Sequence, residues 1–540
     1  MTPPPPTADA PHGGPRAPAR LTHRQIVTVL YGLMLGMFLA ALDQTVVSSA
    51  LRTIADDLHG LTAQAWVTTA YLVTGTIATP LYGKLSDVHG RRPVYLWAIA
   101  LFTAGSLLCG FATSVHQLAG FRAVQGLGGG GLMSLAMTII ADITSPRERG
   151  RYQGYITTVF AASSVVGPLV GGVFAEHATL LGIDGWRWIF LVNVPLAALA
   201  VVVILRVLHV PHEPVRHRLD YAGAVALATG IVPLLVIAEQ GRSWGWASPR
   251  ALALYAVGLA GLAAFVLLER RAGDAALLPL RLFRIKAFRL GAVLHFVVGI
   301  SMFGAMAVLP LYLQLVQGMT PVEAGLATLP TVVANVAVTL VVGRLMSRTG
   351  KFKVHLVAGT GSLTVAMALF ATLRVDSPLW YVGLGMLFLG AGLGAAMQTI
   401  TTLAQSEVPR RDMGAATASV NFFRSNGGTV GTAAFLSILF TLAGPRITER
   451  LTAAFTDPAL RRTAGEPANA VPLEGVLRPG GGVNLEDSAF LRALDPVVAR
   501  PFLEGYVSSM QAVFLTAAAV SLLAFVIAAR RVPDTVLSAD

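Results

Sequence analysis

The sequence alternates between long apolar runs and short polar links. About fourteen runs approach or exceed the ~20 apolar residues that a helix needs to cross a bilayer. A backbone within lipid must satisfy its own hydrogen bonds, so these runs predict helices. We therefore expect an all-α integral membrane protein. The runs lie near residues 25–50, 62–82, 93–112, 117–141, 152–176, 187–208, 220–239, 251–269, 288–314, 323–345, 354–373, 379–405, 415–442 and 507–530.

The composition agrees with a bilayer as the solvent. Hydrophobic residues make up 54% of the chain and charged residues only 13%, too few to cover a soluble globule. The net charge of +12 lies in short links rather than on one amphipathic face, which argues against nucleic-acid binding. The single cysteine, Cys109, lies within an apolar run. We expect no disulfide framework, metal or cofactor.

The positive charges predict the orientation. Links after even-numbered runs hold many Lys and Arg residues, such as Lys84, Arg91, Arg92 and Arg147, whereas links after odd-numbered runs hold few. This asymmetry places the even links and both termini in the cytoplasm. The exception is the arginine-rich segment 445–500, but a loop of this length crosses regardless of charge. Abundant Arg, Ala and Gly with few Lys suggest a bacterial source, and hence its cell membrane.

A repeated loop divides the chain into two related halves. The segment Gly83–Val94 reads G-x-L-S-D-x-x-G-R-R-x-V, and a weaker copy runs from Gly343 to Val354. We expect a disordered cytoplasmic tail, a six-helix half, two inserted helices, a second six-helix half that includes an outer loop at 445–500, and a short cytoplasmic tail. These parts span residues 1–20, 21–210, 211–275, 276–531 and 532–540.

The first loop resembles the signature loop of the major facilitator superfamily, and the layout resembles its 14-helix drug/proton antiporters. The resemblance implies that Asp87 faces the start of a helix in the other half and that Arg91 bonds Asp142. In the second copy Ser347 replaces the acid, so only the first loop carries a charged latch. The candidate latch residues are Gly83, Asp87, Gly90, Arg91, Arg92 and Asp142.

Asp43 lies well inside the first run. An acid at this depth costs several kcal/mol and is a functional candidate by default. Burial disfavours the charged form, so the group can be loaded and unloaded with a proton. A carboxylate near the outer headgroups is the alternative. The segment also resembles the L-D-x-T-V-V pattern of the 14-helix antiporters, although Ser48 and Arg52 depart from it.

Arg122 lies a few residues into the fourth run and needs an anion, carbonyls or water. Helices one and four run in opposite directions, which places Asp43 and Arg122 at similar depth, as natural partners. The segment resembles the R-x-x-Q-G-x-G motif of the superfamily, in which the arginine is associated with proton coupling. A purely structural ion pair is the alternative.

The fifth run contains Gly167-Pro168-Leu169-Val170-Gly171-Gly172. Proline removes a helical hydrogen bond and glycines admit a neighbouring helix, so we expect a kink and a tight seam. The segment resembles the G-P-x-x-G-G motif that marks exporters in this superfamily.

Further polar residues within the runs are candidates for a substrate cavity. Asn421 and Arg424 share one helix face, being three residues apart. Interhelical hydrogen bonds are the alternative role for each of these residues and for His295. The candidates are Gln44, Thr45, Gln125, Asn335, Gln398, Asn421 and Arg424.

These features predict a proton-coupled secondary active exporter of lipophilic small molecules, cations among them, that works by alternating access. No G-x-x-x-x-G-K-[ST] loop is present, so the proton gradient rather than ATP is the expected energy source. Export of a lipid or an endogenous metabolite, or a non-transporting membrane sensor, are the alternatives. We expect no enzymatic activity, a monomer, and no partners beyond substrate, protons and the bilayer.

Overall fold

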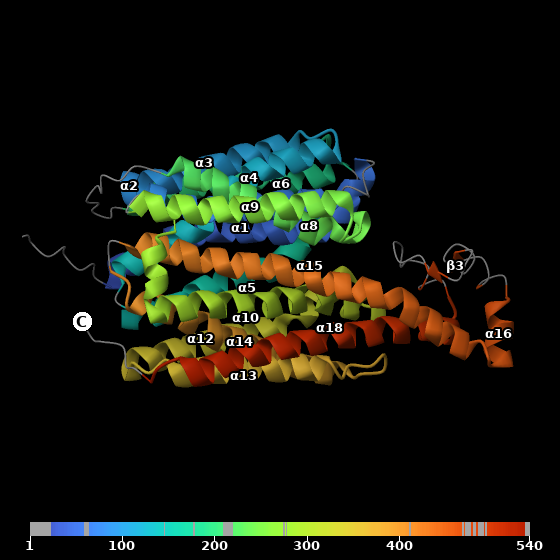
Figure 1. Cartoon of the computed structure of the whole chain (residues 1–540). Coiled ribbons are helices and arrows are strands. Elements are labelled where there is room, and N and C mark those ends of the chain that lie inside the picture. The colour runs from blue at the N-terminus through green and yellow to red at the C-terminus, as the bar shows by residue number, and fades with distance from the viewer. Residues whose placement is uncertain are drawn as a thin grey trace, which may run out of the picture.

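The computed structural model is a bundle of long, roughly parallel or antiparallel helices (Figure 1). It confirms the prediction of an all-α membrane protein. The predicted N-terminal tail, the link at 209–219 and the last six residues lie outside the described residues. The structure describes residues 23–58, 64–144, 146–176, 179–208, 220–273, 276, 278–409, 412–466, 469, 477–478, 482–483, 491 and 494–534.

Each of the first six predicted runs coincides with a helix or a pair of helices. The sixth run is broken, because Pro195 has no N–H to bond the preceding turn. A two-stranded hairpin precedes this break. The elements are α1 His23–Asp57, α2 Gln64–His89, α3 Arg91–Gly110, α4 Val115–Ile143, α5 Pro146–Glu176, β1 Thr179–Leu180, β2 Ile183–Asp184, η2 Gly185–Arg187, α6 Trp188–Leu191 and α7 Asn193–Val207.

The two inserted helices, α8 Tyr221–Trp244 and α9 Pro249–Ala272, form a hairpin beside the seam between the halves. Residues of α8 and α9 share one apolar cluster with Val73 of α2 and Phe422 of the second half. The pair therefore packs against both halves at once.

The second half repeats the pattern of the first. Its tenth run is split near Thr328, and a π-helical turn follows α10. The elements are η4 Leu280–Arg284, α10 Lys286–Leu311, η5 Tyr312–Val316, α11 Pro321–Ala327, α12 Leu329–Thr349, α13 Lys353–Phe370, α14 Leu379–Ser406, α15 Met413–Ala454, α16 Pro458–Ala464, β3 Leu477–Arg478, β4 Gly482–Val483 and α18 Pro496–Arg531.

Each half has its own hydrophobic core. One large cluster combines residues of α1 to α5 and α7, and another combines α10 with α12 to α15 and α18. The halves meet along two seams, α5 against α12 and α2 against α15. Two separately packed bodies joined at limited seams can rock relative to one another.

The sequence predicts an outer loop with short helical pieces over 445–500, and the structure shows longer helices at both of its ends. Helix α15 continues to Ala454 and α18 already begins at Pro496, so both extend past the rest of the bundle beside α16 and β3 (Figure 1). Ion pairs support the extension: Arg500 lies 2.6 Å from Asp376 and 3.2 Å from Glu504. The described part of this segment therefore contains more helix than the apolar pattern alone indicated.

Eleven described helices are long and apolar enough to cross a membrane. Helices α2 and α5 do not meet this criterion, and α8 contributes only a shorter apolar stretch, Ala222–Ile237. All three pack within the same bundle as the other helices. A count near fourteen spans is consistent with this arrangement.

Candidate functional site

Asp43 lies near the middle of α1, because this helix runs on to Asp57. Its side chain is buried, with 1% exposure. Its burial and the helical turns on both sides of it favour a position inside the helix bundle over a carboxylate at the helix end. A carboxylate at such depth requires donors from neighbouring helices.

Three side chains donate hydrogen bonds to the Asp43 carboxylate. Arg122 approaches Oδ2 at 2.6 Å, and the amides of Gln125 and Asn193 each donate to Oδ1 at 2.8 Å. Arg122 and Gln125 come from α4 and Asn193 from the start of α7. The expected pairing of Asp43 with Arg122 is therefore present, within a network from three helices that we call the Asp43 cluster.

Neighbouring groups enclose Arg122. Its guanidinium lies 4.2 Å from the centre of the Tyr71 ring and donates to the side-chain oxygen of Gln125 at 2.8 Å. The side chain is 1% exposed. A charge that is desolvated to this extent depends on its paired anion, so removing Asp43 would leave an uncompensated cation.

Sequence reasoning missed Asn193. Its amide nitrogen also lies 2.9 Å from the hydroxyl of Ser106, which in turn donates to the carbonyl of Phe190. An asparagine within the apolar sixth run was the available signal. The side-chain oxygen of Asn193 is buried and accepts no hydrogen bond from the residues that the structure describes.

Two residues that we expected to line a cavity lie elsewhere or point to a helix seam. Gln125 is fully buried in the Asp43 cluster rather than at a cavity wall. Thr45 is partly buried, and its hydroxyl lies 3.0 Å from the carbonyl oxygen of Ser163 in α5. Gln44, its neighbour on α1, is also partly buried.

The two glycines of the first signature loop permit tight turns, and its sequence predicts a compact turn, but the structure shows it to be almost entirely helical. Helix α2 continues to His89, and α3 begins at Arg91. Only Gly90 departs from the helix, with φ of 91°, a value that favours glycine. Gly83 serves close packing instead: a Cβ there would lie 2.7 Å from the Cβ of Ala418 in α15.

The latch residues lie as the resemblance implied. Asp87 pairs with Arg91 at 2.6 Å, and Arg91 pairs with Asp142 of α4 at 2.7 Å. A Cβ at Gly414 would lie 2.5 Å from an oxygen of Asp87, so the carboxylate abuts the first turn of α15. The positive end of that helix dipole favours an acid. Arg92 donates to the carbonyl of Leu205 at 2.7 Å.

The second copy of the loop makes no such connection. The hydroxyl of Ser347 donates to the carbonyl of Arg344 in its own helix, at 2.8 Å. Lys353 at the start of α13 pairs with Asp534 just after α18, at 3.1 Å. Among the described residues, the charged contact between the two halves at this loop comes from the first copy.

The polar residues of the second half are less completely paired. Arg424 makes no hydrogen bond or ion pair with any residue that the structure describes, and its buried Nε has no acceptor. The side-chain oxygen of Gln398 is likewise buried without a donor in the described chain. Asn335 accepts from Thr339 at 3.3 Å within α12, and Asn421 is partly buried.

Comparison with known proteins identifies the family. The model of the Major Facilitator Superfamily matches residues 33–432. This chain belongs to that superfamily.

Relatives in the superfamily cover most of the chain. It is 34% identical over 515 residues to an uncharacterized MFS-type transporter of Mycobacterium tuberculosis, covering 95% of this chain and 70% of the relative. It is 32% identical over 424 residues to the multidrug transporter protein MdtP of Bacillus subtilis, covering 78% and 77%. The human organic anion transporter MFSD10 shares the fold, with a TM-score of 0.61 at 15% identity over 93% of this chain and 99% of that one.

The glycine–proline motif of this superfamily member lies in α5 against α1. A Cβ at Gly167 would lie 2.1 Å from the hydroxyl of Thr45, so the two helices are in close contact there. Gly171 is buried, whereas a Cβ at Gly172 would meet nothing within 4 Å. The predicted seam is thus present at Gly167 and absent at Gly172. The side chain of Pro168 lies outside the described residues.

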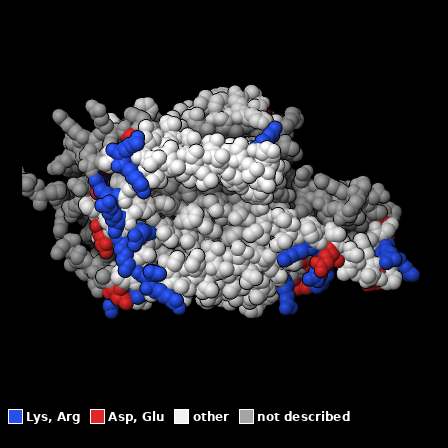
Figure 2. Space-filling view, viewed as in Figure 1, with Lys and Arg blue, Asp and Glu red and all other residues white. Residues whose placement is uncertain are grey.

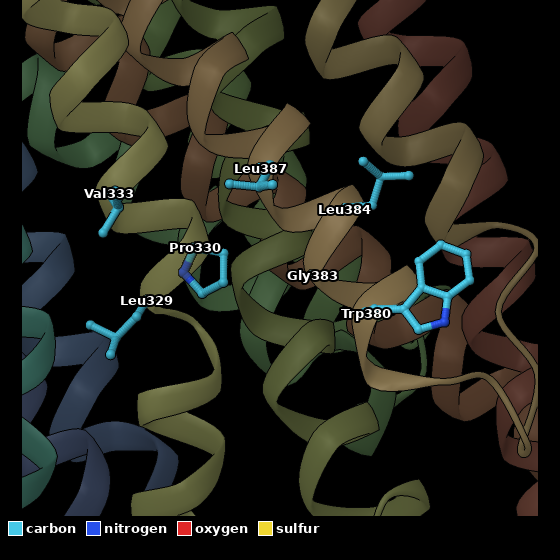
Figure 3. A pocket seen from close by; sticks show the side chains of 7 residues that line it. All are labelled: Leu329, Pro330, Val333, Trp380, Gly383, Leu384 and Leu387. Atoms are coloured by element: carbon cyan, nitrogen blue, oxygen red, sulfur yellow. The ribbon is translucent and has the colours of Figure 1, made fainter.

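A groove on the surface of the second half holds about 640 Å³. Leu329, Pro330 and Val333 of α12 lie on one side and Trp380 and Leu384 of α14 on the other, with Gly383 and Leu387 completing it (Figure 3). Every one of these residues is apolar or lacks a side chain. The groove is typical of a seam that faces lipid tails rather than of a site that recognises polar groups.

Proposed function

We propose that this protein is a proton-coupled exporter that exchanges lipophilic small molecules for protons across the cell membrane, as a monomer. The observation that carries the proposal is the Asp43 cluster: a buried carboxylate, in a spanning helix, held by Arg122 at 2.6 Å. The printed name of the Bacillus subtilis relative supports multidrug efflux as the transport class. The proton gradient supplies the energy, and no cofactor takes part.

Protonation of Asp43 would change the contacts of several helices. The charged carboxylate accepts from α4 and α7 while it sits on α1. A proton removes its charge and weakens the attraction to Arg122, so the three helices lose part of what holds them together. This gives the proton a means to shift the balance between two arrangements of the halves.

The latch supplies the link between the halves. Asp87 on α2 meets the start of α15, and Arg91 ties this carboxylate to Asp142 on α4, the helix that also carries Arg122. An acid at a helix N-terminus contributes roughly 0.3 to 1 kcal/mol. A contact of this size favours one state without preventing the other.

The charge distribution supports cytoplasmic termini. Basic residues gather at the end of the bundle where the chain terminates, and the opposite end carries a smaller mixed group (Figures 1 and 2). The latch end holds the Lys353–Asp534 pair and the Arg281–Asp412 pair. An excess of Lys and Arg marks the cytoplasmic side of membrane proteins.

Transport in proteoliposomes with an imposed pH gradient tests the proposal. The protein should export a lipophilic dye when the gradient is present and stop when an ionophore collapses it. Asp43→Asn keeps size and hydrogen bonding but cannot titrate, so proton-driven export and substrate-induced proton release in detergent should both be lost. Undiminished proton release in correctly folded Asp43→Asn protein would place the coupling site elsewhere. Gradient-independent uptake by both proteins would contradict antiport.

A further inference from the structure

Arg424 carries a charge inside the bundle that no described residue neutralises. It sits on α15, partly buried, and its Nε is enclosed without an acceptor among the described residues. The cost of holding an unpaired arginine in a membrane interior is several kcal/mol. Such a group persists when it has a function in binding.

The second half contains no acid that would neutralise this charge within the span. Asp and Glu are absent from residues 286–322, 324–375, 377–406, 413–448 and 505–533. His295 of α10 lies within electrostatic range of Arg424 but cannot supply a negative charge. Its two ring nitrogens lie 3.1 Å from the carbonyl of Gly291 and 3.3 Å from the hydroxyl of Thr401.

Among the described residues, no carboxylate of the first half pairs with Arg424 either. Its buried carboxylate, Asp43, is already held by Arg122, Gln125 and Asn193. The pair of Asp43 and Arg122 sums to zero charge when the carboxylate is ionised. Because these three donors already occupy the Asp43 carboxylate, it is not free to pair with a cationic substrate in this arrangement.

We propose that Arg424 forms a binding site for the anionic group of a substrate, so that the exporter selects lipophilic acids over lipophilic cations. This inference rests on the proposed export function and names the substrate class. A carboxylate or phenolate would accept charge-assisted hydrogen bonds from the guanidinium, including its unused Nε. The apolar residues around it, such as Phe422 and Phe423 on the same helix, would contact the rest of the molecule.

Two dyes with one xanthene ring system separate charge from shape: fluorescein is an anion and a rhodamine ester is a cation. Fluorescence anisotropy with the purified full-length protein in detergent gives both affinities without any gradient. We expect tighter binding of fluorescein. Arg424→Gln should weaken fluorescein binding about tenfold or more and leave the rhodamine ester unaffected or bound more tightly. Arg424→Lys, which keeps the charge, should retain most of the fluorescein affinity.

Arg348→Gln serves as the matched control, because it removes one positive charge at the exposed end of α12. It should leave both affinities unchanged. The proposal fails if wild-type protein does not bind fluorescein, if Arg424→Gln leaves its affinity unchanged, or if both dyes weaken equally. Retained rhodamine binding shows that the variant is folded. If the unmodified protein binds fluorescein more tightly than the rhodamine ester but shows no gradient-driven export, that result would overturn the proposed proton coupling and still support an anion-binding site at Arg424.

Discussion

The two halves of the molecule treat a buried arginine in opposite ways. Arg122 in the first half has a carboxylate at 2.6 Å, an amide oxygen at 2.8 Å and an aromatic ring beneath it. Arg424 in the second half has none of these among the described residues. The arginine of the first half is therefore paired within the protein, whereas that of the second half can still bind an anion.

The difference suggests a division of labour. The charge of the Asp43–Arg122 pair can change without a ligand, because a proton can bind Asp43. The charge of Arg424, which has no partner among the described residues, can be neutralised only when an anion binds. Helices α10 and α14, which correspond in order to α1 and α4, contain no acid along their lengths. Under the two proposals above, the proton would act in the first half and the substrate's charge in the second.

Replacing each arginine by methionine should break this comparison most clearly. Arg122→Met leaves Asp43 buried without its cation and should destabilise the fold by about 3 to 5 kcal/mol. Arg424→Met removes a cation that lacks a partner, so it should leave stability unchanged or raise it. Thermal unfolding in the same detergent, followed by intrinsic tryptophan fluorescence, compares the two variants directly.

The double replacement Asp43→Leu with Arg122→Met is the control for that experiment. It removes both charges together, and replacing a buried pair by apolar residues is often neutral or stabilising. Stability should therefore return toward that of the unmodified protein. Equal destabilisation by Arg122→Met and Arg424→Met would show that the two arginines are held alike and would remove the contrast between the halves.

Asn193→Leu tests how completely the Asp43 cluster depends on its third donor. A hydrogen bond to a charged group contributes about 1.5 to 3 kcal/mol, so we expect a loss of this order or somewhat less. Asn335→Leu in α12 is the comparison, because the one side-chain hydrogen bond of Asn335 to a described residue comes from the neutral hydroxyl of Thr339 at 3.3 Å. A smaller shift in melting temperature for Asn193→Leu than for Asn335→Leu would contradict the cluster.

Local pattern was sufficient to predict the helices and the charged pair. The length of the apolar runs predicted the helices. The energetic cost of an unpaired charge in lipid predicted that Asp43 and Arg122 form an ion pair. The latch contacts with Asp142 and the start of α15 came from family resemblance. The roles of Asn193 and Gln125 could not be predicted, because they depend on which helices lie in contact. A single sequence does not reveal these contacts between helices.

Helix ends were harder to predict than helix existence. The apolar pattern of the thirteenth run stops near residue 442, yet α15 continues to Ala454 because charged residues outside the membrane also favour helix. The loop at Gly83–Val94 is helical for the same reason: its polar residues extend α2 by two turns. Composition indicates where the apolar run ends, whereas the helix continues beyond it, in α15 even past Pro445.

The smallest predicted effect compares the two copies of the signature loop. Asp87→Asn removes the charge that faces the start of α15, while Ser347→Ala alters the equivalent place in the second copy, where the hydroxyl bonds only its own helix. An acid at a helix N-terminus is worth roughly 0.3 to 1 kcal/mol, which corresponds to a few-fold change in the rate of exchange between states. Asp87→Asn should therefore slow transport a few-fold and leave dye affinity intact, and Ser347→Ala should change neither.

Initial export rates in proteoliposomes, normalised to the amount of folded protein, measure this difference. Gly414→Ala gives an independent approach from the other side of the contact, since its methyl group would press on the Asp87 carboxylate at 2.5 Å. It should slow transport in the same direction as Asp87→Asn, and the two changes together should be less than additive because they disturb one contact. If Ser347→Ala slowed export as much as Asp87→Asn, the two loops would act symmetrically and the latch would belong to both halves.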